Sequence, residues 1–313
     1  IIVVDDGSTD DSRDVINSYE RTGRITAVFK ENGGQASALN VGLKHSSGEI
    51  VVFLDADDYL SREAVDVIVS EWEEGLSRLE YFLEKVDETG KSLGLTAPPT
   101  KGPSGDLRGV LRKHGTYPSS PTSGNAWSRG FLKKIMPIPE EDWKISADSY
   151  LSHLAPIFGR IKFLERSLGF YRIHGMNRFD VGFGLSFEKL YLNFSVHEKT
   201  ARLLENHRGA QRNCLYPATY YQIGLVIAAL YGEKLPNDFP PLKQPLSFYL
   251  TGLHKHIILP WLGLPRKVWS ALLLTTLLLF PKTLGTRFAL LTYNPKTRPS
   301  WLSGLVHLFN RRK

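Results

Sequence analysis

The stretch IIVVDDGSTDDS, residues 1–12, decides the fold class of this chain. Its first four residues, Ile1–Val4, are β-branched, which predicts a strand buried on both faces. Two carboxylates, Asp5 and Asp6, follow directly, and Gly7 then predicts a turn. A strand that ends in this way places acidic side chains at the edge of a sheet.

The alternation of strands and helices continues beyond this opening. Ser8 and Asp11 have the spacing of a capping box, which predicts a helix that extends to about Tyr19. Two further strands and two further helices are predicted, over residues 25–29, 49–54, 36–46 and 62–74. Such alternation with short connections predicts an α/β fold with a mostly parallel sheet flanked by helices.

Polar residues follow each of the three predicted strands. Asp5 and Asp6 end the first strand, Asn32 and Gly33 follow the second, and the sequence DADD, residues 55–58, follows the third. Taken alone, each segment is more often a turn or a helix cap than a ligand site. In an α/β sheet, however, ligands bind beyond the carboxyl ends of the strands. Carboxylates gathered there repel one another unless a cation neutralises them, and oxygen ligands of this kind favour Mg²⁺ or Mn²⁺.

Charge is distributed unevenly along the chain. Residues 1–60 carry five Lys and Arg against eleven Asp and Glu, a net charge of −6, whereas residues 241–313 carry eleven basic residues and no acidic ones, a net charge of +11. The acidic start suits a metal or a sugar-like ligand. The basic, apolar end suits an anionic lipid surface, and it holds no recognisable nucleic-acid module. The single cysteine, Cys214, excludes an intramolecular disulfide and favours a reducing compartment.

An apolar segment lies within the basic end. Val268–Phe280 has thirteen mostly apolar residues, which is short of the ~20 that a membrane-spanning helix needs. Together with Trp261, Trp269 and the terminal basic residues, it predicts a helix that lies in the membrane interface. The alternative is a buried helix with solvated basic flanks. We therefore expect a cytoplasmic protein that associates peripherally with the inner face of the cell membrane.

Six segments together resemble a known family. VVDDGSTDDS, ENGGQASALNVGL and GEIVVFLDADD are similar to the nucleotide-sugar motifs of family 2 inverting glycosyltransferases, which have the GT-A fold. The resemblance continues through SGNAWSRGFLKKIMPIPE, ISADSYLSHLAPIFG and YRIHGMN. It implies a GT-A (Rossmann-like) catalytic domain over residues 1–178, followed by a helical, basic extension over residues 179–313.

The resemblance also implies that a first strand–helix unit, on the order of 30 residues long, is missing from the start of the sequence. That strand would be central in the sheet, and its absence would leave Ile1–Val4 unpaired on one side. We therefore expect the chain as written to bind nucleotide sugar weakly, and an extended form to be active.

The resemblance assigns the donor site residue by residue. Asp5 and Asp6 would contact the base, and Asn32 with Gly33 would line the nucleotide pocket. The ribose would lie against Asp55. The remaining donor-site and metal residues implied by the resemblance are Ala56 and Arg172 for the nucleotide sugar, and Asp57 and His174 for the Mg²⁺ or Mn²⁺ ion. A histidine such as His174 on a short strand is equally often structural.

The same resemblance assigns the catalytic base and an acceptor site. Asp148 would accept the proton of the acceptor hydroxyl, although it could instead cap the helix that follows it. Nearby competitors for the base are Glu141 and Asp142. Asn125 and Trp127 would form an acceptor platform, although Trp127 could equally belong to the core.

These observations predict an inverting glycosyltransferase. Its donor would be a nucleotide diphosphate sugar, with a UDP-sugar favoured, and its acceptor a saccharide or a lipid-linked glycan in cell-surface polysaccharide synthesis. An impaired transferase that acts as a binding module is the main alternative. Nucleotidyl transfer is a third possibility, but the start of the chain lacks a basic loop that could grip a triphosphate.

Overall fold

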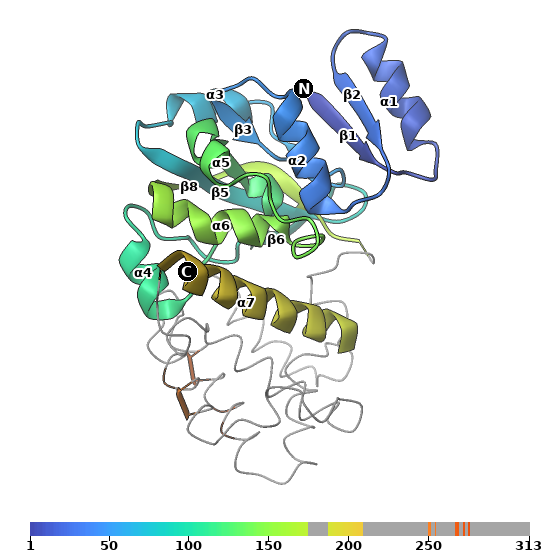
Figure 1. The fold of residues 1–313 in the computed structure, drawn as a ribbon. Helices are drawn as coiled ribbons and strands as arrows, with labels where there is room; N and C mark the ends of the chain where they lie inside the picture. The colour runs from blue at the N-terminus through green and yellow to red at the C-terminus, as the bar shows by residue number, and fades with distance from the viewer. Residues whose placement is uncertain are drawn as a thin grey trace. The chain divides into compact units, whose positions relative to one another are not determined.

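The structure is a computed structural model, and it describes residues 1–174, 187–208 and seven isolated positions between residues 250 and 275. The chain divides into two compact units, and Figure 1 labels helices and strands of the described residues. The first comprises Ile1–Val86, Ser92–Arg108 and Pro118–Arg172, and the second comprises Asp87–Lys91, Gly109–Tyr117 and the chain from Ile173 onward. The predicted domain boundary at residue 178 lies outside the described residues and stays a prediction.

The strands all belong to the first unit. They are β1 (Ile2–Asp6), β2 (Thr26–Lys30), β3 (Ile50–Val52), β4 (Tyr59–Leu60), β5 (Leu76–Val86), β6 (Ser92–Ala97), β7 (Asn125–Ser128) and β8 (Arg160–Arg172). The helices of this unit are α1 (Ser12–Glu20), α2 (Gln35–His45), α3 (Ala64–Ser70), α5 (Arg129–Ile135), α6 (Ala147–Phe158) and the short 3₁₀ helix η1 (Thr122–Gly124). The second unit holds most of α4 (Arg108–His114) and all of α7 (Phe187–Arg208).

The strands form two sheets. In the smaller sheet β1 and β2 are parallel, with Val4 opposite Val28. The larger sheet has the order β3-β7-β5-β8-β4, and β6 pairs with β5 in addition. The predicted α/β fold with flanking helices is confirmed, but the larger sheet is mixed rather than mostly parallel. Only β5 and β8 run parallel within it, because β6 returns from β5 as a hairpin and both β7 and β4 run antiparallel to their neighbours.

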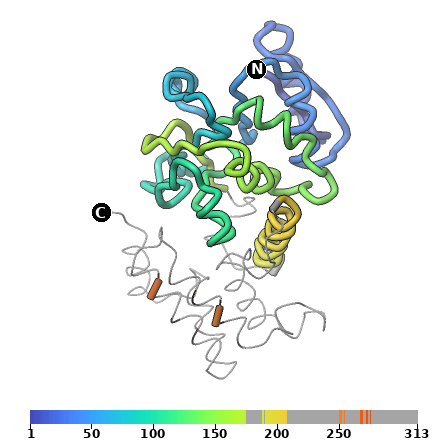
Figure 2. The backbone as a smooth tube through the Cα atoms, turned by 60° about the vertical axis from the view of Figure 1, so that its left-hand side comes forward, coloured from blue at the N-terminus to red at the C-terminus, as the bar shows by residue number. Residues whose placement is uncertain are grey.

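The first strand is less buried than its sequence predicts. Ile1 is 91% exposed, and the three following residues are only half-buried. Among the described strands β1 is hydrogen-bonded to β2 alone, so fewer neighbours cover it. The small sheet and α1 stand at one side of the unit in both views (Figures 1 and 2). The capping box is also wrong: the N–H of Ser8 donates to Asp5, and α1 begins only at Ser12.

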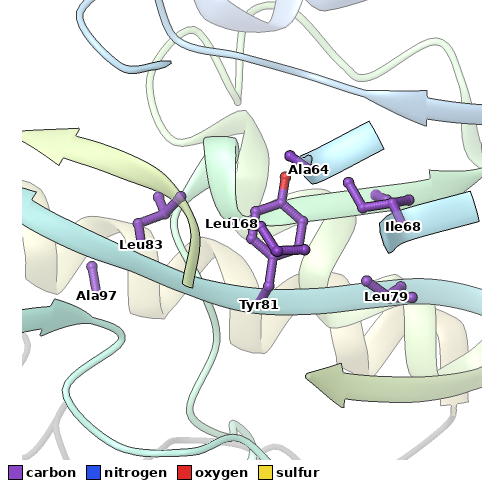
Figure 3. Close-up of a cluster of buried hydrophobic side chains, with 8 residues drawn as sticks. Ala64, Ile68, Leu79, Tyr81, Leu83, Ala97 and Leu168 are labelled. Carbon is purple, nitrogen blue, oxygen red and sulfur yellow. The ribbon is translucent and has the colours of Figure 1, made fainter. Parts of the chain in front are cut away.

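The core of the unit is built on β5. Leu79, Tyr81 and Leu83 alternate along this strand, and all three are fully buried. They pack against Ala64 and Ile68 of α3 (Figure 3), together with side chains of β7 and β8. Burial of each large side chain contributes roughly 1.5–3 kcal/mol. This core therefore fixes α3, which follows the DADD sequence after the short strand β4, against the centre of the larger sheet.

The apolar segment near the end of the chain is mostly outside this description. Val268–Phe280 lies almost entirely outside the described residues, so its predicted place in the membrane interface stays a prediction. Within the described part of the chain, no helix combines the length and apolar character required to cross a bilayer.

Candidate functional site

The carboxylate of Asp6 organises the loop that follows β2. Lys30 Nζ lies 2.6 Å from Asp6 Oδ1, and the backbone N–H groups of Gly33 and Gly34 donate to the same carboxylate at 2.9 and 2.7 Å. Burial alone would raise the pKa of Asp6, but these hydrogen bonds outweigh it and lower the pKa. Asp6 is therefore ionised and anchors the glycine loop, which contains Gly33 and Gly34. The contact of Asp6 with the nucleotide base stays a prediction.

The glycine loop leaves no room for side chains. A Cβ on Gly33 would lie 2.6 Å from Ser37 Oγ, and one on Gly34 would lie 2.6 Å from the carbonyl oxygen of Lys144. Gly34 also has a φ of +84°, which favours glycine. A side chain at Gly33 is therefore excluded by contacts within the fold. Asn32 is exposed beside these glycines.

Asp5 lies behind this loop and is buried. It accepts hydrogen bonds from Arg13 Nε at 2.7 Å and from the N–H of Ser8 at 3.0 Å. Burial acts to raise the pKa of Asp5, but the hydrogen bonds from Ser8 and Arg13 lower it overall. Its carboxylate therefore joins α1 to the end of β1.

The acidic turn, residues Asp55–Asp58, is fastened to the end of β8. The N–H of Asp58 donates to the carbonyl of Asp55 at 3.1 Å, which closes the turn. Arg172 donates its N–H to Asp58 Oδ1 and its Nε to the carbonyl of Asp57, both at 3.0 Å. Ala56 is exposed at the tip and Asp57 is half-buried. Arg172 therefore positions the acidic turn through the carboxylate of Asp58 and the backbone carbonyl of Asp57.

Two carboxylates of this turn, Asp55 and Asp58, carry raised pKa values. Burial, and then the nearby charge of Asp148, raise the pKa of Asp55 to about 7, although a hydrogen bond with Thr122 acts in the opposite direction. Burial also raises the pKa of Asp58 to about 6, against a hydrogen bond with Ser123. Asp58 Oδ2 is buried and has no hydrogen-bond partner. The turn thus concentrates more negative charge than its protein partners neutralise.

Asp148 lies in the first turn of α6. The N-cap of this helix is Ser146, so the alternative that Asp148 is the cap is wrong. Asp148 is half-buried, and burial raises its pKa, although the N–H of Ser149 and the charge of Arg78 act to lower it. The helix dipole favours an anion at this position. The competitors Glu141 and Asp142 are both exposed.

The predicted acceptor residues lie in the interior. Asn125 and Trp127 are 0% and 1% exposed. Asn125 Oδ1 accepts a hydrogen bond from Arg78 Nε at 2.8 Å, and the Arg78 guanidinium lies 4.9 Å from the centre of the Trp127 ring. The acceptor platform is therefore wrong, and the core alternative for Trp127 is correct.

The same buried arginine forms an ion pair with Glu80. Arg78 Nη2 lies 3.0 Å from Glu80 Oε2, and both side chains are fully buried. Arg78 also donates to Ser119 Oγ at 2.7 Å. Its charge acts on Asp148 and on His153, which lies further along α6. These contacts hold the positive charge of Arg78 in a fixed position, from which it acts on the candidate base, Asp148.

His153 is held in its neutral form by its surroundings. Burial lowers the pKa of His153 to about 4, and the charge of Arg78 acts in the same direction, against a hydrogen bond to the carbonyl of Ser149. The ordinary value is 6.5. Between these two values the unfolded state binds more protons than the folded state. The stability that neutral His153 contributes is therefore complete above pH 6.5 and is lost as the pH falls toward 4.

Replacing His153 with glutamine is expected to flatten this pH dependence. The free energy of unfolding of the wild type should fall more steeply between pH 6.5 and about 4 than that of His153→Gln, and urea unfolding across this range measures the difference. The exposed His45, replaced in the same way, is the control and should behave as the wild type. An equal slope in His153→Gln and the wild type would contradict the assignment.

Comparison with known proteins identifies the first part of the chain. Residues 1–101 match the model of the family described as glycosyl transferase family 2. The matched region is about a third of the chain and holds β1 to β6 and the acidic turn.

Individual relatives agree with the family match. An uncharacterized glycosyltransferase of Nostoc sp. is 37% identical over 183 residues, which cover 56% of this chain and 56% of that protein. A chondroitin synthase of Pasteurella multocida is 38% identical over 73 residues, covering 23% of this chain and 8% of that protein. The chain therefore spans about half the length of the Nostoc relative.

A solved structure agrees in fold. The crystal structure of S. aureus TarS 1-349 has a TM-score of 0.50 and 18% sequence identity, covering 93% of this chain and 81% of that chain. At this identity the likeness concerns the fold alone.

The acidic turn has a donor set that fits a divalent cation. Asp55, Asp57 and Asp58 offer hard carboxylate oxygens, and the orphaned Asp58 Oδ2 with the raised pKa values shows uncompensated negative charge. Within the described residues, no three His, Cys, Asp or Glu side chains are already arranged as a metal site. His174 belongs to the second unit, two residues after β8, and its role as a metal ligand stays a prediction.

Several residues that shape the site were not expected from the sequence. The most connected is Gln35, which directly follows the glycine loop and hydrogen-bonds with both Asp55 and the first residue of α6. Thr122 and Ser123 of η1 contact the acidic turn. Arg78 gave no signal in the sequence, because charged residues at alternate positions of a strand usually mark a solvent-exposed face.

Proposed function

We propose that this chain transfers a sugar from a nucleoside diphosphate sugar to a hydroxyl group, with inversion at the anomeric carbon. The observation that carries the proposal is that Gln35, beside the glycine loop, hydrogen-bonds with both Asp55 and the N–H of Ala147, the residue immediately before Asp148. Asp55 and Asp148 come from segments remote in sequence, and the charge of Asp148 adds to the effect of burial in raising the pKa of Asp55. A donor-binding carboxylate next to a candidate base is the arrangement that such a transfer requires.

Asp148 is proposed to act as the general base. The acceptor oxygen forms a bond with the anomeric carbon while the bond to the diphosphate breaks, and the acceptor proton moves to a carboxylate oxygen of Asp148. Burial raises the pKa of Asp148, which brings its basicity closer to that required near neutral pH. A single carboxylate on the acceptor side is sufficient for inversion.

The acidic turn is proposed to hold Mg²⁺ or Mn²⁺ through Asp57. When bound, the ion would neutralise the charge that develops on the leaving diphosphate. Arg172 keeps the turn in place through the backbone of Asp57 and the carboxylate of Asp58. Asp55 is proposed to contact the ribose, and Asp6 with Asn32 the base.

The donor is proposed to be a UDP-sugar and the acceptor a saccharide or lipid-linked glycan of the cell surface. The similarity to a chondroitin synthase supports a saccharide acceptor. The charge of +11 over residues 241–313 supports a peripheral location at the inner face of the cell membrane.

Calorimetric titration with UDP tests the donor and metal assignments. In the presence of Mn²⁺, replacing Asp57 with alanine is expected to weaken UDP binding by roughly tenfold or more, because the residue that would hold the cation is lost. A chelator should have the same effect on the wild type. The exposed Asp66 of α3, replaced by alanine, provides the control and should bind UDP as the wild type does. UDP affinity that is unchanged by chelator would remove the metal from the proposal.

A further inference from the structure

Gln35 connects α2 to three other segments of the first unit. Its backbone N–H donates to the carbonyl of Lys144 at 2.9 Å. Its side-chain oxygen Oε1 accepts a hydrogen bond from the N–H of Ala147 at 2.9 Å. Its side-chain nitrogen Nε2 donates to Thr122 Oγ1 at 3.1 Å and to Asp55 Oδ1 at 3.3 Å. One side chain therefore contacts the acidic turn, η1 and the start of α6.

Helix α6 depends on this contact because its own cap is incomplete. The N-cap residue Ser146 has a φ of +67° and forms no side-chain hydrogen bond to the helix. Its Oγ is buried without a hydrogen-bond partner. The first N–H groups of a helix need acceptors from outside the helix. Gln35 Oε1 supplies one for Ala147, the residue that immediately precedes Asp148.

The orientation of the Gln35 amide follows from its partners. The backbone N–H of Ala147 can only donate, so the amide oxygen must face it. The amide nitrogen then faces the oxygens of Asp55 and Thr122, which can accept. A single planar group thus fixes the acidic turn and the start of α6 relative to each other.

We propose that Gln35 is a positioning residue that holds Asp148 in register with Asp55 and the donor. This inference rests on the proposed function, in which Asp148 is the base. A base must lie within hydrogen-bond reach of the acceptor hydroxyl, and a displacement of about 1 Å can cost a hundredfold in rate. Loss of the amide frees the first turn of α6 and should therefore affect the chemical step more than donor binding.

Steady-state kinetics of Gln35→Ala test this inference. The variant is expected to lower kcat by roughly 10- to 100-fold, while KM for the donor changes by no more than about twofold. Gln35→Met retains the length of the side chain without its amide, and it should show the same kcat loss. Gln35→Met tests the inference in place of Gln35→Ala if the alanine variant does not fold.

Asn40→Ala is the matched control from the same helix. The amide of Asn40 also reaches across, with Oδ1 accepting from the N–H of Ile138 at 2.8 Å and Nδ2 donating to the Ile138 carbonyl at 2.9 Å. It contacts neither Asp55 nor Ala147 in the described hydrogen bonds. Asn40→Ala is expected to lower the midpoint of thermal unfolding while retaining most of kcat.

Two outcomes would overturn the inference. One is a kcat of Gln35→Ala equal to that of the wild type, and the other is an equal loss of kcat in Gln35→Ala and Asn40→Ala. A different result would contradict the proposed function: an Asp148→Asn variant that retains full activity. An enzyme that requires Asp148 but not Gln35 would contradict the positioning role alone.

Discussion

Replacing Asp148 with asparagine is expected to lower kcat by roughly 10²- to 10⁴-fold, the usual contribution of a general base. Asparagine has nearly the same shape, so the first turn of α6 should keep its geometry, but it cannot accept the acceptor's proton. UDP affinity should remain close to that of the wild type, since Asp148 contacts the acceptor side in the proposed mechanism. Initial rates of UDP release in the presence of acceptor measure kcat, and calorimetry measures the affinity.

Asp142→Asn is the matched control for this experiment. Asp142 lies six residues earlier, is exposed, and was the competing candidate for the base. It should retain kcat. The assignment of the base would be contradicted if Asp142→Asn lost activity while Asp148→Asn retained it.

Replacing Arg78 with methionine is expected to destabilise the protein by about 3–5 kcal/mol. The change leaves Glu80 fully buried without the cation that lies 3.0 Å away. Burial raises the pKa of Glu80, and Arg78 opposes this effect, so removing Arg78 leaves the carboxylate with its full desolvation cost. The free energy of unfolding, measured in urea, should fall accordingly.

A double variant separates the ion pair from the packing of Arg78. Arg78→Met combined with Glu80→Met should recover much of the stability, because an apolar pair can replace a buried ion pair. The exposed pair of Lys101 and Glu165 provides a comparison, and Lys101→Met should change stability little. An Arg78→Met single variant as stable as the wild type would show that the buried pair contributes nothing.

Local patterns in the sequence were sufficient for the first part of the fold. β-Branched residues followed by Asp and Gly predicted β1, and β2, β3 and the helices α1 to α3 appear within a few residues of their predicted bounds, whereas β4 was not predicted. These elements depend on neighbours along the chain. The capping box failed because Asp5 attracts the N–H of Ser8, a contact that only the end of a folded strand can offer.

The mixed sheet and the interior of the site depended on contacts remote in sequence. The pairing of β5 with β8 joins segments about eighty residues apart, which periodicity alone does not reveal. Trp127 and Asn125 were ambiguous because the partner that buries them, Arg78, lies on another strand. Gln35 was missed for a similar reason, since its importance comes from Ala147 and Asp55 together.

The resemblance to family 2 glycosyltransferases supplied what periodicity could not. It singled out Asp148 and Asp55 before any contact between their segments was known, and the structure brings both segments to Gln35. The role of Asp148 as general base and that of Asp55 in donor binding stay predictions until they are measured.

The anomeric configuration of the product tests the central claim most directly. If Asp148 deprotonates an acceptor that attacks opposite the diphosphate, proton NMR of the first product formed from an α-linked UDP-sugar should show a β-linkage. Formation of the α-linked product would contradict the account, because one base and a direct displacement cannot retain the configuration of the anomeric carbon.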